Sequence, residues 1–324
     1  MHFPDVLPLS IFLAGGFCLL ILFMVVSVMY RLLHPPRLSA GVAAARGWWI
    51  DPSDAGLEYD EWTLRLEKVG EVPVWEINHP SDPDGPVLIM THDWSESKIA
   101  ALQRVPAILP YLSRIVLWDL PGHGDTEAST SCLLGSREKR YLDELVRRSS
   151  EKRPTILYGW GMGAGISTCV ASRNVQVIGT IIERPSRNYI HQVNLVLGEF
   201  GIPFIPVGMI VQLVLWIIFP GLRNQDILDC TNRLSRPILV LPGAEENQPV
   251  AQTARMVAEA AASGEYAELE TGDIQGRLSE GERRLERRIR DFIQACVARW
   301  TQETGSAGMR GSGGSSTFSA STAL

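Results

Sequence analysis

The hydrophobic pattern of this chain begins with one long apolar run. Residues Leu7 to Tyr30 contain no charged side chain. As a helix rising about 1.5 Å per residue they would be roughly 36 Å long, enough to cross a hydrocarbon layer ~30 Å thick. A transmembrane anchor and a cleaved signal peptide are both compatible with this length. The absence of a basic segment before the run and the interfacial ending at Tyr30-Arg31 favour the anchor, which we predict for residues 1–30.

The charges that flank this run predict its orientation. Three arginines follow it, Arg31, Arg37 and Arg46, whereas only Asp5 and His2 precede it. Cytoplasmic flanks of membrane helices carry the excess of basic residues. We therefore expect a single-pass membrane protein whose soluble part faces the cytoplasm.

Beyond a predicted linker at 31–58, the pattern changes to short β-rich runs separated by amphipathic segments, as far as about residue 300. Eight strands are predicted, at 62–68, 72–78, 86–91, 114–119, 154–158, 176–182, 237–242 and 265–271. Helical periodicity separates the later ones, at 97–109, 136–149, 162–173, 250–262 and 280–300. Two lead strands followed by βαβ units predict an α/β domain over 59–300, with a mostly parallel eight-stranded sheet flanked by helices.

A predicted cap, residues 185–235, lies between the strands 176–182 and 237–242 and contains a second apolar run, Ile202–Pro220. A single membrane crossing there would put two strands of one sheet on opposite sides of the bilayer. We therefore expect cap helices that either pack on the domain or dip an apolar face into the bilayer surface. The Gly-, Ser- and Thr-rich tail, 301–324, is predicted to be disordered.

Composition narrows the range of partners. The net charge is −6 and no large basic cluster is visible, which argues against nucleic acid as a partner. The five cysteines are scattered and form no CxxC pair: Cys18, Cys132, Cys169, Cys230 and Cys296. This spacing argues against a disulfide scaffold or a zinc site and is compatible with a reducing compartment. We predict no cofactor and no metal ion. The expected partners are the lipid bilayer and an apolar small ligand or a protein.

Three turn motifs follow successive predicted strands. Residues 91–95 read THDWS, 118–124 read WDLPGHG and 159–163 read GWGMG. Their order and spacing resemble the α/β-hydrolase superfamily, most closely its serine-aminopeptidase-like and lipase-like branches, over about residues 59–300. The resemblance implies an α/β-hydrolase fold in which these motifs are the oxyanion loop, the D-x-x-G-H-G turn and the nucleophile elbow.

The elbow lacks the residue on which that chemistry depends. Gly161 stands at the central position, where the resemblance implies a hydroxyl, thiol or carboxylate side chain. The neighbouring Trp160 and Met162 offer no nucleophile. Ser167 lies further along the following helix, where its hydroxyl is expected to be buried or bonded locally. The elbow is therefore predicted to be degenerate.

The other catalytic positions depart from the pattern as well. The loop after the last strand, 272–276, contains no histidine, and none occurs after His191 in the cap. Glu246 best matches the usual acid and is a possible remnant of it. The backbone N–H groups of Trp94 and Met162 are the expected oxyanion-type donors.

Two further features of the turn motifs bear on this site. Asp93, where glycine is usual, would place a negative charge beside the expected donors and disfavour an oxyanion. His92 and His123 match positions at which a histidine orients loops.

Magnitudes favour a protein without serine-hydrolase activity. Losing the nucleophile or the base of a catalytic triad costs on the order of 10⁶ in kcat, and losing both costs little more. The oxyanion hole and binding retain only roughly 10³–10⁴ over water. We therefore predict a non-catalytic binding or scaffolding module with a retained apolar pocket between sheet and cap. The Gly-rich elbow is similar to that of the N-myc downstream-regulated proteins, regarded as inactive members of the superfamily.

Two alternatives remain at this stage. The first is an active hydrolase that acts on ester, lipid or peptide substrates through a non-standard site, with water activated by Asp93, Asp119 or Glu246. The second is dinucleotide binding, because residues 159–164 fit G-x-G-x-x-A after a strand and Glu183 ends the next strand.

Overall fold

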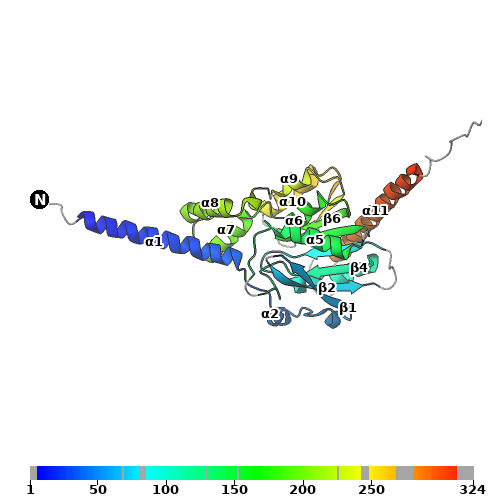
Figure 1. Cartoon of the computed structure of the whole chain (residues 1–324), viewed down its shortest axis with the longest axis horizontal. Helices are drawn as coiled ribbons and strands as arrows, with labels where there is room; N and C mark the ends of the chain where they lie inside the picture. Colours follow the sequence, from blue (N-terminus) through cyan, green and yellow to red (C-terminus); the bar gives the residue numbers. More distant parts are fainter. Residues whose placement is uncertain are drawn as a thin grey trace, which may run out of the picture.

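A long helix projects from a body of strands and helices (Figure 1). The computed structural model describes residues 6–67, 69–79, 85–127, 130–151, 153–224, 226–241, 248–267 and 280–311. The projecting helix is α1 (Val6–Leu33). Among the described residues, its segment Leu9–Leu33 is the one helical stretch long and apolar enough to cross a membrane, and a signal sequence would pass the same test.

Eight strands form one sheet in the order β1-β2-β4-β3-β5-β6-β7-β8. β2 is antiparallel to both β1 and β4, and every other neighbouring pair is parallel. The strands are β1 (Tyr59–Leu66), β2 (Gly70–Asn78), β3 (Val87–Thr91), β4 (Arg114–Trp118), β5 (Thr155–Trp160), β6 (Val177–Glu183), β7 (Ile238–Leu241) and β8 (Gly264–Tyr266). The predicted mostly parallel, eight-stranded sheet is confirmed. β8 is shorter than the predicted strand 265–271, whose last four residues lie outside the described part of the chain.

Helices cover both faces of the sheet and enclose two apolar layers. Along β3, Val87 and Ile89 belong to one layer and Leu88 and Met90 to the other, so this strand is buried on both faces and reads as a continuous apolar run. Side chains from α1 and from α5 to α10 complete the first layer, and those from α2, α3, α4 and α11 complete the second. The helices are α2 (Ala40–Ala45), α3 (Lys98–Leu102), α4 (Val105–Ile108), α5 (Glu138–Ser149), α6 (Met162–Ala171), α7 (Ile190–Glu199), α8 (Met209–Ile218), α9 (Ile227–Thr231), α10 (Gln248–Ala260) and α11 (Glu280–Gly311). Four short helical turns are η1 (Pro52–Ala55), η2 (Leu109–Tyr111), η3 (Phe204–Gly208) and η4 (Pro220–Asn224).

Two predictions about helical segments, at 97–109 and at 301–311, differ from the structure. The single helix expected at 97–109 is broken into α3, α4 and η2, because Pro106 fits the first turn of α4 but has no N–H with which to continue a preceding helix. The predicted disorder is wrong for residues 301–311, through which α11 continues. Arg299 pairs with Glu303 at 3.0 Å one turn later, and this pair supports the extension. Residues 312–324 lie outside the described part.

The interpretation of the cysteines also needs correction. Cys169 on α6 and Cys230 on α9 form a disulfide that links positions 61 residues apart. The two helices pack against each other, so the fold brings together cysteines whose sequence spacing carries no motif. Within the described residues, Cys18, Cys132 and Cys296 are free.

The cap consists of α7, η3 and α8 and lies beside the C-terminal half of α1 (Figure 1). Arg31 of α1 pairs with Glu199 of α7 at 2.9 Å. The segment predicted as a linker is folded onto the body as well. Arg37 donates a hydrogen bond to Gly124 O at 3.1 Å, and Leu38 is buried in the second apolar layer.

Candidate functional site

Three loops meet at the carboxyl edge of the sheet. β3, β4 and β5 are parallel neighbours, so the loops that begin at His92, Asp119 and Gly161 leave the sheet at the same edge. Ligands of open α/β sheets bind at this edge. The three motifs noted in the sequence therefore lie together in space.

The turn between β5 and α6 is sharp. Gly161 has φ +54° and ψ −117°, a conformation that glycine adopts without the steric penalty of a Cβ. Gly163 is equally constrained by close packing, because a Cβ there would lie 2.1 Å from Thr91 O. The chain thus has the backbone of a nucleophile elbow.

The carboxylate of Asp93 fills the place that a nucleophile would take. A Cβ added to Gly161 would lie 1.9 Å from Asp93 Cγ. Asp93 Oδ1 accepts hydrogen bonds from the backbone N–H of Trp94 and of Met162, both at 2.7 Å. These are the two N–H groups named from the sequence as oxyanion-type donors, and they converge on a carboxylate of the chain itself.

The surroundings of Asp93 raise the pKa of its carboxyl group to about 7. Burial is the largest cause, and the neighbouring charge of Glu96 acts in the same direction. The N–H groups of Met162 and Trp94 and the charge of Arg184 act in the opposite direction. Asp93 was recognised in the sequence as an intruding charge, but its occupation of the elbow is visible only in three dimensions.

Of the two motif histidines, His92 links two loops, whereas His123 Nδ1 lies 3.0 Å from Pro121 O of its own turn. His92 Nε2 accepts a hydrogen bond from Leu120 N at 2.9 Å, and its Nδ1 lies 2.7 Å from Asp93 O. Burial lowers the pKa of His92 to about 4 and that of His123 to about 3. Both rings are therefore neutral at physiological pH, and His92 is fully engaged in joining the loop after β3 to the loop after β4.

The other acidic residues considered from the sequence are engaged or outside the described part. Asp119 is fully buried and accepts from Lys98 Nζ at 2.9 Å and from Asp125 N at 3.0 Å. Glu246 and the loop 272–276 lie outside the described residues. Among the residues that the structure does describe, no group of three His, Cys, Asp or Glu side chains could hold a metal ion.

The contacts of Glu183 and of the α6 N-terminus argue against dinucleotide binding. Glu183 accepts hydrogen bonds from Arg104 at 3.0–3.1 Å and from Tyr158 Oη at 3.1 Å, so its carboxylate is already used. The N-terminus of α6, where a pyrophosphate would bind, already receives the Asp93 carboxylate at the Met162 N–H. Sequence spacing did not reveal the partners of Glu183, because Arg104 lies in the turn between α3 and α4 and Tyr158 lies on β5.

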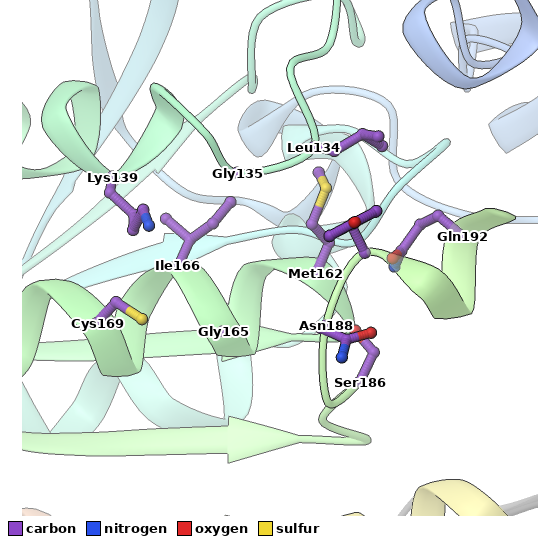
Figure 2. Close-up of a pocket in the computed structure, with 11 residues that line it drawn as sticks. Leu134, Gly135, Lys139, Met162, Gly165, Ile166, Cys169, Ser186, Asn188 and Gln192 are labelled. Carbon is purple, nitrogen blue, oxygen red and sulfur yellow. The ribbon is translucent and has the colours of Figure 1, made fainter. Parts of the chain in front are cut away.

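A small space lies beside the elbow, lined by residues that the structure describes. Its lining comes from the segment before α5, from α5, α6 and α7, and from the segment between β6 and α7, as Figure 2 shows. Its volume of about 20 Å³ is enough for one or two water molecules. Lys139, Asn188 and Gln192 contribute polar groups to a lining that is otherwise mostly apolar.

A larger groove of about 430 Å³ lies between α7 and α10. His191 and Asn194 of α7 and Thr253 and Met256 of α10 contribute to its walls. His191 is therefore part of this groove and does not line the small space at the elbow, and burial lowers its pKa. The groove lies in the size range of small-molecule sites.

Comparisons with known proteins identify the fold. No protein-family model and no curated protein sequence matches the chain. Solved structures do match. An esterase from Pyrococcus furiosus has a TM-score of 0.58 at 17% identity, covering 81% of this chain and 99% of its own. A hydrolase from Pseudomonas aeruginosa has a TM-score of 0.53 at 16% identity, over 74% and 98% of the two chains.

A third match agrees with these two. An α/β hydrolase from Sphaerobacter thermophilus has a TM-score of 0.51 at 14% identity and covers 72% of this chain and 100% of its own. Identities this low carry information on the fold and not on activity. The strand order, the sharp turn at Gly161 and these similarities agree, and the chain has the α/β-hydrolase fold.

Proposed function

We propose that this chain is a membrane-anchored α/β-hydrolase-fold protein without hydrolase activity, which acts by binding or scaffolding. The Asp93 carboxylate carries the proposal. It takes both the position of the missing nucleophile side chain and the two N–H groups that would stabilise an oxyanion. A substrate carbonyl would have to displace an internal hydrogen-bond acceptor and would then meet no nucleophile at Gly161.

The small volume of the space beside the elbow supports a binding role elsewhere on the domain. A space for one or two waters cannot admit an ester, a lipid chain or a peptide bond. The groove between α7 and α10 is large enough for a small ligand and has both polar and apolar walls, as such sites commonly do. We take this groove as the candidate ligand site of the proposed binding module.

Several contacts support a retained anchor over a cleaved signal sequence. Val25, Val28 and Leu32 of α1 are buried in the same apolar layer as the cap. Leu32 O accepts a hydrogen bond from Trp94 Nε1 at 3.3 Å, and Leu33 O accepts one from Cys132 N at 2.8 Å. Removal of α1 would expose the apolar surface beneath it and leave these two donors unpaired, at a cost of about 1–3 kcal/mol for each buried group.

The catalytic test is activity of the full chain in detergent against a panel of p-nitrophenyl esters and a fluorophosphonate probe. We expect no covalent labelling and no turnover above the buffer rate. An intact serine esterase is the positive control. The alternative, an active hydrolase with a non-standard site, requires turnover that disappears in Asp93→Asn or Glu246→Gln, and that result would overturn the proposal.

For orientation, we propose the cytoplasmic side for the domain, because Arg31, Arg37 and Arg46 follow the span. The Cys169–Cys230 disulfide is the opposing observation, since such bonds are rare in the cytosol. Labelling of Val175→Cys with a membrane-impermeant maleimide on intact cells shows on which side of the membrane the domain lies. Protection until lysis agrees with the proposal, whereas immediate labelling places the domain on the other side.

A further inference from the structure

The cap carries an apolar surface that nothing in the described chain covers. We define this cap face as the exposed apolar side chains of η3 and α8, whose exposed fractions run from 37% to 69%: Phe204, Ile205, Met209, Leu213, Trp216, Ile217 and Ile218. The opposite side of α8 is largely apolar too, because Val211 and Leu215 are fully buried and the half-buried Gln212 is the one polar side chain of this helix. A helix that is apolar on nearly all sides belongs in a protein core or in a membrane.

The cap lies beside the part of α1 that a bilayer would have to cover. The cap contacts α1, and the buried or half-buried apolar residues of α1 run from Ile21 to Leu32. Crossing a bilayer takes about 20 apolar residues, whereas Leu9–Leu20, before the first cap-facing residue, would be only about 18 Å long. A bilayer that accommodates α1 therefore extends past Ile21 and surrounds the cap at the same depth.

Charged groups lie at both ends of the uncharged cap run. No charged residue occurs from 200 to 222, and Glu199 and Arg223 flank this run. Glu199 pairs with Arg31 at the end of α1. The guanidinium of Arg223 lies 3.9 Å from the centre of the Trp216 ring. Arginine beside an aromatic ring at the end of an apolar segment is typical of the membrane–water interface.

We propose that η3 and α8 are embedded in the bilayer leaflet beside the C-terminal half of α1, with the cap face against lipid acyl chains. The partner is the bilayer itself, because the cap face continues the lipid-facing surface of α1. The inference rests on the proposed anchoring role of α1 and extends membrane contact from this helix to η3 and α8. The body of the domain then lies directly on the membrane surface.

The test is the environment of a single fluorophore on the full chain in phosphatidylcholine vesicles. Leu213, 56% exposed on α8, is replaced by cysteine in a Cys18→Ser background and labelled with the environment-sensitive dye NBD. Cys132 and Cys296 are buried and should not react in the folded protein. Val175→Cys, at an 84% exposed site on the body, is the aqueous control. Native Cys18, exposed on α1, is the control for the anchor.

We expect quenching of the Leu213 label by doxyl lipids to be several-fold stronger than that of the Val175 label, with iodide quenching reduced to the same degree. If the Leu213 label resembles the Val175 label while the Cys18 label is quenched by doxyl lipids, the inference is wrong and the anchor stands. If labels at Cys18 and Leu213 are both open to iodide, the anchor itself fails. If the Leu213 label is shielded from both quenchers, the cap face meets protein and the lipid assignment is overturned. Met209→Cys repeats the measurement on the same face.

Discussion

The ionisation of Asp93 should make the stability of this protein depend on pH in an unusual direction. Burial raises the pKa of its carboxyl group from 3.8 to about 7 in the folded state. Because the folded state holds this proton more tightly than the unfolded state, the contribution of Asp93 is most favourable below pH 3.8. It is lost as the pH rises through 7. A paired or solvent-exposed aspartate does not show this trend.

Asp93→Asn isolates the effect. The asparagine Oδ1 can accept from the N–H groups of Trp94 and Met162 but cannot ionise. For a carboxyl group with a pKa of 3.8 in the unfolded state and about 7 in the folded state, the free energy of unfolding falls by roughly 2 to 3 kcal/mol as the pH rises from 5 to 8. The free energy of unfolding of the asparagine variant, relative to that of the parent, should therefore be higher at pH 8 than at pH 5 by about the same amount.

The measurement is denaturant unfolding of the full chain in detergent at pH 5 and pH 8, with the difference between variant and parent taken at each pH. Asp229→Asn, on an exposed residue of α9, is the matched control because its side chain is already in water. A difference for Asp93→Asn that is the same at both pH values would refute the reasoning. It would mean that the carboxylate at the elbow is solvated.

Three other substitutions test the contacts around the site and the core. Gly161→Ser should lower the free energy of unfolding by about 1–3 kcal/mol or more. Adding Asp93→Gly should recover the part of that loss that comes from the clash with the carboxylate, while the backbone strain at position 161 stays. Denaturant unfolding measures both, and neither variant should have esterase activity. Cys230→Ser should cost about 2–4 kcal/mol, and an unchanged unfolding midpoint would show that the disulfide does not form. Glu183→Gln should cost about 1–3 kcal/mol because it weakens the pairing of the Arg104 guanidinium, and a change below ~0.5 kcal/mol would indicate that water replaces the carboxylate.

The fold was predictable because its signals are local. Buried parallel strands such as β3 appear as short runs of Val, Leu, Ile and Met between turns, and the sharp elbow at Gly161 requires small neighbours at 159 and 163. The helix at 97–109 was predicted with wrong bounds, because Pro106 can begin a helix as well as end one.

The candidate site was predictable only in its residues. The sequence identified Asp93, Trp94 and Met162 separately, and the absence of a nucleophile and of a late histidine was plain. That the carboxylate sits in the elbow depends on the register of β3 against β5 and on the direction of one side chain. Neither property leaves a periodic signal in the sequence. The same holds for the Cys169–Cys230 bond, which depends on how α9 packs against α6.

The packing of α1 against the cap has a consequence for how the chain folds during synthesis. Arg31 and Glu199 are 168 residues apart, and at about 5–20 residues per second the ribosome needs roughly 8–34 s to add that length. For that interval the face of α1 that holds Val25, Val28 and Leu32 has no cap to pack on. In a bilayer, lipid acyl chains can cover this face of α1 until the cap has been synthesised. With α1 as the proposed anchor, the body of the protein is expected to complete its core on the membrane, after α1 has been inserted.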